Sequence, residues 1–225
     1  MRVKPPSINT PRSTRVPLRL ASILCGVAIL AGLSGCETLE AYRKSQERKA
    51  LLVKAAAEYQ AFTQDSKNKR KIYRNDELLS ELTPSNSRIV ISLGKQRAYV
   101  FLDDVVVIDT YVSSGKRGFR TPKGQYKVLD KLPENRSNLY GKIYDGEGNI
   151  LKSDADTRVD EAPEEGEFVG ALMPYWMRLT RDGVGMHVGR TPRYAASHGC
   201  VRVPRAIQPL IYKKSKVGTP VAVTD

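Results

Sequence analysis

Two histidines and a lone cysteine lie close together near the C-terminal end of the sequence. His187, His198 and Cys200 fall within the stretch MHVGRTPRYAASHGC, and these are the only two histidines of the chain. A thiol enzyme needs a thiolate nucleophile and an imidazole that takes the thiol proton and returns it to a leaving amine. Gly199 allows a sharp turn that brings backbone amides towards a reacting carbonyl. The stretch therefore predicts a nucleophilic site centred on Cys200.

The residues alone leave three other interpretations open. Cys200 could be a small buried hydrophobic residue. The two histidines and Cys200 could bind zinc with a water as the fourth ligand, although the spacing H-x10-H-x-C matches no common zinc pattern. His198 could hold the turn through ring hydrogen bonds instead of moving protons. Our prediction is a site without a metal or a cofactor.

The first 35 residues are typical of an export signal. They carry five basic residues and no acidic one, followed by the apolar run LRLASILCGVAILAGL. The run is too short for a span of about 20 apolar residues, although an uncleaved anchor is the alternative. The residues Leu33-Ser34-Gly35-Cys36 resemble the bacterial lipoprotein cleavage box. That resemblance implies cleavage before Cys36, lipidation of its thiol and anchoring to a membrane.

Processing changes how charge and cysteine content are interpreted. The formal charge of +13 falls to +8 without the five basic residues of the signal, which fits work on an anionic surface or polymer. No nucleic-acid-binding motif accompanies the charge, so nucleic acid is not an expected partner. Cys25 leaves with the signal and Cys36 carries lipid, so Cys200 is the only free thiol. The residue after the expected lipidated cysteine is Glu37. By analogy with lipoprotein sorting, the absence of an aspartate there favours the outer membrane. The expected location is therefore the periplasmic side, anchored to that membrane.

The rest of the chain divides into a helical segment and a β-rich body. Residues 36–85 contain no glycine or proline before Pro84 and favour a helical stalk or linker. Residues 86–225 contain short runs of branched residues, with Asp103-Asp104 as a hairpin turn, and predict a mostly β fold, a sandwich or a barrel, with few short helices. Residues 141–168 are rich in Asp and Glu and are expected to form a solvated loop.

The motif around Cys200 resembles the signature of the L,D-transpeptidase (YkuD-type) catalytic domain. The family pattern is a histidine, a variable spacer, then Ser/Thr-His-Gly-Cys, a hydrophobic residue and Asn or Arg, and Ser197 to Arg202 follow it after His187. The resemblance extends to the loop Thr121-Pro122-Lys123-Gly124 and to Met173-Pro174-Tyr175-Trp176. It covers about residues 86–224 and is highly specific.

The resemblance implies both a substrate and a role for each matching residue. The family acts on the stem tetrapeptide of peptidoglycan, so Cys200 would attack the carbonyl of the third residue, a diamino acid, and expel D-alanine. His187 would be the general base and acid, with its ring oriented by the carbonyl of Val188. The resemblance implies that Ser197, His198 and Gly199 support the turn or the oxyanion, together with the backbone amide of Cys200. It implies substrate binding for Arg202, Tyr175 and Trp176.

Two departures from the family pattern affect the choice of acceptor. Only nine residues separate His187 from Ser197, and Arg202 stands where several members carry Asn. A second stem is the expected acceptor, which gives a 3→3 cross-link, and attachment of a protein is a variant of it. A short loop would also admit water, so an L,D-carboxypeptidase or hydrolase is one alternative, and a non-catalytic wall-binding lipoprotein is another. Oligomeric state does not follow from the sequence.

Overall fold

The computed structural model describes the backbone of residues 27–225 and the side chains from residue 38 onward. The expected signal at residues 1–35 lies largely outside this range. The side chain of Cys36 lies outside it. The chain divides into two compact units, with the boundary between Lys49 and Ala50. No helix among the described residues is long and apolar enough to cross a membrane.

A long helix connects the two units in sequence. Helix α1 spans Val27–Gln64. In the first unit, its exposed side chains form ion pairs one turn apart, such as Lys44 with Glu40 at 3.0 Å, which favours helix. The helical N-terminal segment expected from composition is confirmed, but the long helix ends at Gln64, well before the expected boundary at residue 85. A short helical turn η1 (Ser66–Asn68), strand β1 (Tyr73–Arg74) and helix α2 (Asp76–Glu81) follow it.

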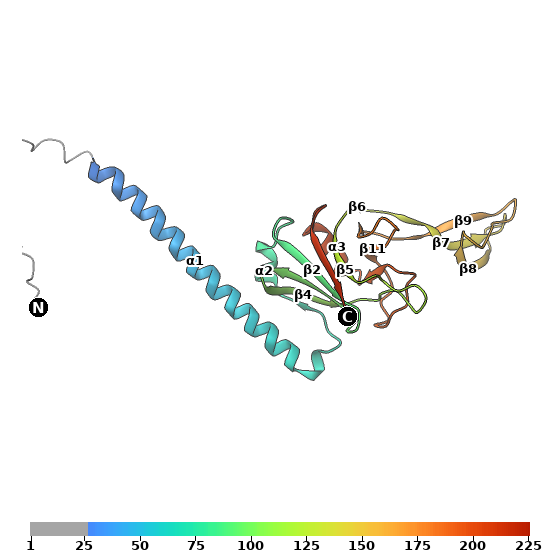
Figure 1. The fold of residues 1–225 in the computed structure, drawn as a ribbon, viewed down its shortest axis with the longest axis horizontal. Coiled ribbons are helices and arrows are strands. Elements are labelled where there is room, and N and C mark those ends of the chain that lie inside the picture. Colours follow the sequence, from blue (N-terminus) through green and yellow to red (C-terminus); the bar gives the residue numbers. More distant parts are fainter. Residues whose placement is uncertain (1–26) are drawn as a thin grey trace, which may run out of the picture. The chain divides into compact units, whose positions relative to one another are not determined.

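The second unit is mostly β, as the sequence predicts, and it contains three sheets (Figure 1). The largest has the strand order β1-β4-β3-β2-β13-β5, and the next has the order β12-β11-β10-β6. The strands of these two sheets are β2 (Ser87–Ser92), β3 (Arg97–Leu102), β4 (Val105–Tyr111), β5 (Gly124–Lys127), β6 (Asp130–Leu132), β10 (Trp176–Arg178), β11 (Gly185–Val188), β12 (Val201–Val203) and β13 (Pro220–Thr224). Helix α3 (Gln208–Lys213) lies between β12 and β13 in the sequence.

The β3–β4 hairpin confirms one local prediction in detail. Leu102 pairs with Val105 across the turn Asp103-Asp104, and Asp103 has a φ of 52°. This left-handed conformation is one that aspartate tolerates better than most residues, and it matches the twist that a two-residue hairpin turn requires.

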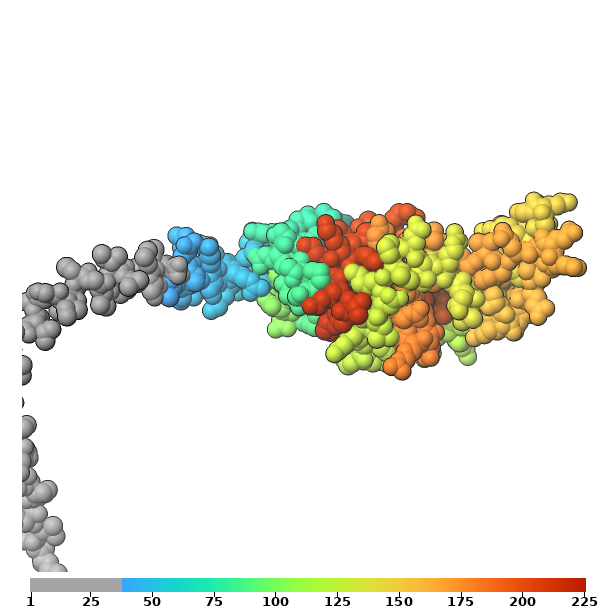
Figure 2. Space-filling view, turned by 90° about the horizontal axis from the view of Figure 1, so that it is seen from above, coloured from blue at the N-terminus to red at the C-terminus, as the bar shows by residue number. Residues whose placement is uncertain are grey.

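The acidic segment folds into a sheet of its own, where a solvated loop was expected. This third sheet consists of strands β7 (Arg136–Tyr144), β8 (Ile150–Asp156) and β9 (Glu167–Leu172), in the order β8-β7-β9. The residues of these strands lie together at one end of the second unit (Figure 2). Most of their side chains are exposed or half-buried. The weak apolar alternation of such a sheet explains why composition indicated a loop.

Residues before the β-rich region complete its core. Ala55 of α1, Leu78 of α2 and Leu82 are buried in the same cluster as the strands β2, β3 and β4. Strand β1 pairs with β4 through Tyr73 and Asp109. The body of the second unit therefore begins within α1, and only the part of the helix before residue 50 belongs to the other unit.

This packing predicts a measurable contribution of α2 to stability. Leu78 is fully buried, so Leu78→Ala should lower the free energy of unfolding by about 2–5 kcal/mol. Val53 is 71% exposed in the same region, so Val53→Ala should change it by no more than about 0.5 kcal/mol. Urea unfolding of both variants measures the difference, and equal stabilities would show that residues 50–82 do not pack on the body.

Candidate active site

Parallel pairing of β11 with β12 brings the two best candidate residues together. His187 lies in β11 opposite Arg202 of β12, and Cys200 directly precedes β12. Both His187 and Cys200 line one cavity of about 590 Å³. His187 is buried, and Cys200 is half-buried and is the free cysteine of the described residues. The structure therefore places an imidazole and a thiol on neighbouring strands at the wall of a common cavity.

A network of short hydrogen bonds fixes the turn that carries the thiol. The hydroxyl of Ser197 donates to the carbonyl of Cys200 at 2.5 Å and accepts the N–H of Gly199 at 3.1 Å. Gly199 has a φ of 117°, which side chains rarely permit. The Gly199 amide would have to leave this hydrogen bond to Ser197 before it could stabilise an oxyanion, so its expected role stays a prediction. The Cys200 amide is the other backbone candidate of the two.

Thr121 anchors the same turn from the opposite side. Its buried hydroxyl donates to the carbonyl of Gly199 at 2.7 Å and accepts the N–H of Gly115 at 3.0 Å. Gly115 leaves no room for a side chain, since a Cβ there would lie 1.9 Å from the carbonyl oxygen of Phe119. The loop containing Thr121 was part of the sequence resemblance, but the sequence alone assigned this hydroxyl no role.

The thiol and the imidazole are both neutral in this structure near pH 7. Burial lowers the pKa of His187 to about 4. Burial also raises the pKa of the Cys200 thiol, opposed in part by the Gly185 N–H and by Arg202 and Arg178. The Nδ1 of His187 lies 2.8 Å from the carbonyl of Val188, so Nδ1–H donates and Nε2 keeps the lone pair. The ring is thus held as a base that can accept a proton from a thiol.

The cavity wall is strongly cationic. Apart from the histidines and the thiol, the cavity is lined by one acidic residue, Asp182. Five arginines also line it, namely Arg136, Arg158, Arg178, Arg181 and Arg202. Asp156 compensates the charge of Arg158 at 2.6 Å. Guanidinium groups bind carboxylates in a bidentate geometry, so a cavity of this kind suits a ligand with several carboxylates.

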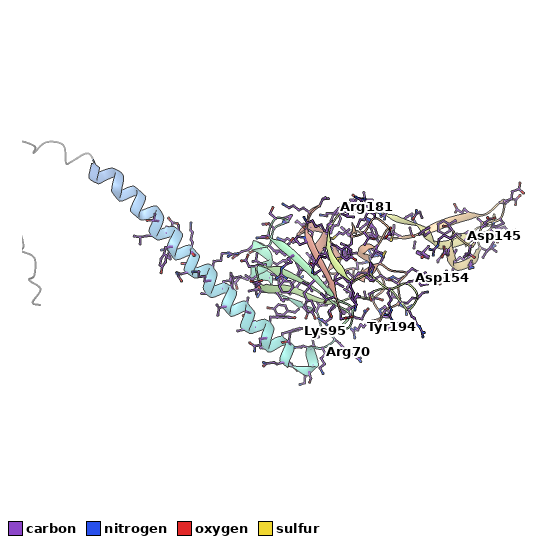
Figure 3. The ribbon with its side chains drawn as sticks, in the orientation of Figure 1. Arg70, Lys95, Asp145, Asp154, Arg181 and Tyr194 are labelled. Carbon is purple, nitrogen blue, oxygen red and sulfur yellow. The ribbon has the colours of Figure 1, made fainter. Side chains whose placement is uncertain are left out.

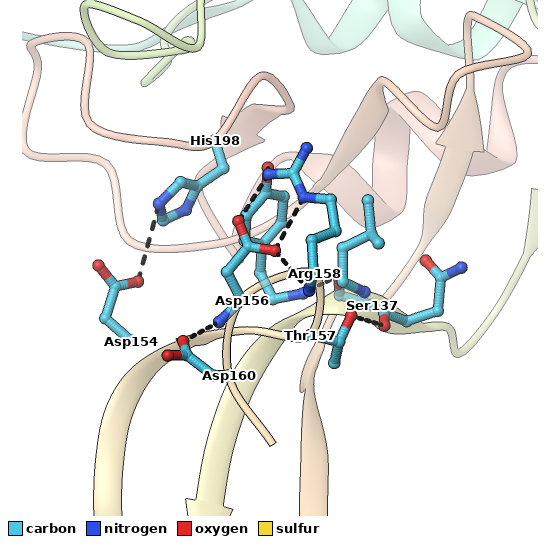
Figure 4. A network of polar contacts seen from close by, with 10 residues as sticks. Ser137, Asp154, Asp156, Thr157, Arg158, Asp160 and His198 are labelled. Atoms are coloured by element: carbon cyan, nitrogen blue, oxygen red, sulfur yellow. Dashed lines mark hydrogen bonds and ion pairs between the residues drawn. The ribbon is translucent and has the colours of Figure 1, made fainter.

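His198 contacts the three-stranded sheet (Figure 4). Its ring stacks on Tyr140 of β7, with centroids 4.3 Å apart and an interplanar angle of 13°. Its Nε2 lies 3.7 Å from Asp154 of β8, and Phe119 contacts the ring edge-on at 4.8 Å. These contacts support a structural role, in which His198 joins the catalytic turn to that sheet.

The two aromatic residues expected in the substrate groove have different environments. Trp176 lines the cavity, with its ring 6.0 Å from that of His187, and its buried Nε1 has no hydrogen-bond partner among the described residues. Tyr175 does not line this cavity but packs against Tyr212 at 5.5 Å. Within the described part of the chain, no group of three or more potential metal ligands is arranged around a common point.

Several lining residues have no signal in the sequence. Arg136 and Tyr140 come from β7, and Arg178 comes from β10. They lie far from the Cys200 motif in sequence and belong to no local pattern. Only the pairing of β10 with β11 and the folding of the third sheet bring them to the cavity.

The anchoring role of Thr121 can be tested by removing its hydroxyl. Thr121→Val keeps the shape of the side chain but leaves a buried N–H and a buried carbonyl without this partner, so the free energy of unfolding should fall by about 1–3 kcal/mol. Thr121→Ser keeps the hydroxyl and should lose less. Chemical denaturation compares the two, and a Thr121→Val variant as stable as the parent protein would contradict the anchoring role.

Comparisons with known proteins identify the family of the β-rich region. The L,D-transpeptidase catalytic domain (YkuD) matches residues 86–223, and no protein of curated function matches. Solved structures similar to this chain include an L,D-transpeptidase from Mycobacterium smegmatis (22% identity, TM-score 0.47, 62% of this chain and 59% of that one). Another is an L,D-transpeptidase from Stackebrandtia nassauensis (19% identity, TM-score 0.46, 69% and 59%).

L,D-transpeptidase 1 from Mycobacterium tuberculosis is also similar, with 20% identity, a TM-score of 0.44 and coverage of 62% of each chain. The present chain thus spans about three fifths of the length of these solved chains. The family match covers more than half of this chain and contains every residue of the His187 and Cys200 motif. The chain therefore belongs to the L,D-transpeptidase (YkuD) catalytic domain family.

Proposed function

We propose that this protein is a cysteine-dependent L,D-transpeptidase that acts on peptidoglycan stem peptides. The observation that carries the proposal is a neutral thiol and a neutral, buried imidazole at the wall of one arginine-lined cavity. A stem tetrapeptide supplies the carboxylates that such a lining can bind. Family membership supplies the reaction class.

The first half-reaction forms a thioester. Nε2 of His187 takes the proton of Cys200 as Sγ attacks the carbonyl of the diamino acid at stem position three. In this mechanism the Cys200 amide stabilises the oxyanion of the tetrahedral intermediate. The carbon–nitrogen bond then breaks, His187 returns the proton to the amine, and D-alanine leaves.

The second half-reaction transfers the acyl group. The side-chain amine of a second stem attacks the thioester, and His187 accepts a proton from this amine. The carbon–sulfur bond then breaks, and His187 passes the proton to Sγ, which restores the Cys200 thiol. The product is a 3→3 cross-link, and a protein amine would give attachment of that protein. The three-stranded sheet contributes residues of β7 to the wall of the cavity that would receive the acceptor.

The proposal includes a location on the periplasmic side, with the outer membrane favoured. It depends on the sequence alone, because residues 1–35 would be removed as a signal and Cys36 would carry the lipid. Mass spectrometry of the N-terminal peptide of protein from membranes tests it. A lipidated Cys36 is the expected result, and an intact N-terminus would overturn it.

Product analysis tests the reaction. Incubation with disaccharide tetrapeptides should give a cross-linked dimer that lacks one D-alanine, and Cys200→Ala should form none while remaining folded. Cys200→Ala is the matched control because Cys200 is the described free thiol. Shortened stems without a dimer would support the hydrolase alternative, and unchanged stems would support a non-catalytic wall-binding protein.

The pH dependence of kcat/KM tests the neutral-pair mechanism. His187 must be unprotonated to accept the thiol proton, and its pKa is lowered to about 4. Activity should therefore persist at about pH 5 and be lost as the pH falls through about 4. An acid limb near the ordinary histidine value of about 6.5 would contradict this mechanism.

Variants of His187 and His198 show which of the two imidazoles causes the loss of kcat/KM at acidic pH. His187→Gln should lower kcat/KM by about 10²–10⁴-fold. His198→Gln should leave the position of the acid limb unchanged, because its ring contacts Tyr140 and Asp154. A limb that shifts in the His198 variant would make His198 the proton acceptor.

A further inference from the structure

A second cavity lies apart from the thiol, on the largest sheet. It has a volume of about 460 Å³ and is lined by Lys69, Arg70, Lys95, Gln96, Arg97, Tyr111, Pro192 and Arg193. None of these residues lines the cavity of Cys200. Figure 3 labels Arg70, Lys95 and the adjacent Tyr194 in one region of the body.

The charge of this second cavity is positive and largely uncompensated. Five of its lining residues are cationic and none is acidic. Asp109 neutralises Arg97 through a buried ion pair at 2.5 Å. Among the residues that the structure describes, none of the other four cationic side chains forms an ion pair. Like charges around one cavity repel one another and focus a positive field, which attracts anions.

The positions of the cationic groups are set by the fold. Arg97 donates to the carbonyls of Lys69 at 3.2 Å and Lys71 at 2.9 Å, which fixes the segment that carries Arg70. Arg193 lies over the ring of Tyr111 at 4.7 Å, and its backbone has a φ of 69°. Backbone strain in a residue other than glycine is retained where the surroundings demand it, often at binding sites.

The second cavity shares a wall element with the catalytic site. Pro192 and Arg193 lie in the connection between β11 and β12, which starts next to His187 and ends at Cys200. The side chain of Gln96 bonds to both the N–H and the hydroxyl of Ser114 at 3.0 and 2.7 Å. The carbonyl of Ser114 accepts the N–H of Ser197 at 3.0 Å. The connection between β11 and β12 and the hydrogen bonds from Gln96 through Ser114 to Ser197 therefore link the two cavities.

We propose that the second cavity binds the carboxylates of a further peptidoglycan stem peptide and holds the enzyme on the polymer. The inference rests on the proposed function, which makes this polymer the substrate. Arg70 and Arg193 provide two guanidinium groups without carboxylate partners, and carboxylates fit such groups in a bidentate geometry. A second contact on the same polymer raises the effective concentration of stems at the catalytic cavity.

Binding to purified, insoluble peptidoglycan tests the inference without catalysis. The full chain carrying Cys200→Ala is sedimented with the polymer, with and without the pair Arg70→Gln and Arg193→Gln. The pair should raise the apparent Kd about tenfold, because each guanidinium loses a charge-assisted contact. The control pair is Arg205→Gln with Lys213→Gln, which removes the same charge from exposed positions outside both cavities. Its Kd should stay within about twofold of the parent value.

Two further binding measurements identify the chemical class of the ligand. Peptidoglycan whose carboxylates have been amidated should bind the parent protein at least as weakly as untreated polymer binds the cavity variant, because amidation removes the carboxylates that either cavity would bind. Vesicles of phosphatidylglycerol should not distinguish the cavity pair from the control pair. Equal binding of the cavity and control pairs to the polymer, equal binding of amidated and native polymer, or selective loss of vesicle binding would each overturn the inference.

Failure of the inference can be separated from failure of the proposed function. With Cys200 intact, the cavity pair should keep kcat on soluble disaccharide tetrapeptides within about twofold, because the thiol is in the other cavity. Full activity on soluble stems without any loss of polymer binding would refute the second site alone. Polymer binding that depends on Arg70 and Arg193, in a protein without activity, would refute the proposed function alone.

Discussion

Parallel pairing of β11 with β12 is the constraint on which the site depends. Parallel strands need a connection of about a dozen residues, and residues 189–200 provide it. The connection ends in the turn that carries Cys200, so the strand register brings this turn to the strand that carries His187. The short spacer in the sequence is therefore near the lower limit for a parallel crossover. The same connection also forms a wall of the second cavity.

The electrostatics of the site favour a base-assisted thiol over a preformed ion pair. Burial works against charge on both His187 and Cys200, which keeps the imidazole ready to accept a proton. The positive charge lies instead on the arginines of the wall, where it can bind carboxylates without protonating the base. In the proposed mechanism, substrate binding and proton transfer therefore fall to different side chains within one cavity.

The sequence predicted the local features well and the long-range ones poorly. The Ser-His-Gly-Cys motif and the Asp103-Asp104 hairpin depend on neighbouring residues, so composition and spacing were sufficient for the mostly β fold and the Cys200 turn. Arg136 and Tyr140 reach the cavity only through a sheet formed from a segment expected to be a loop. The burial of Leu78 likewise depends on packing against distant strands. The occupied Gly199 amide and the placement of Tyr175 depend on side-chain contacts that no pattern contains.

Detection of a covalent intermediate on Cys200 would test nucleophilic catalysis by this thiol. The enzyme is mixed with a stem tetrapeptide, quenched in acid and digested for mass spectrometry. The account predicts a thioester on the peptide that contains Cys200, with the mass of the stem without its terminal D-alanine, and a much slower appearance of this adduct in His187→Gln. An adduct on any other residue, or product formation by Cys200→Ala, would contradict it.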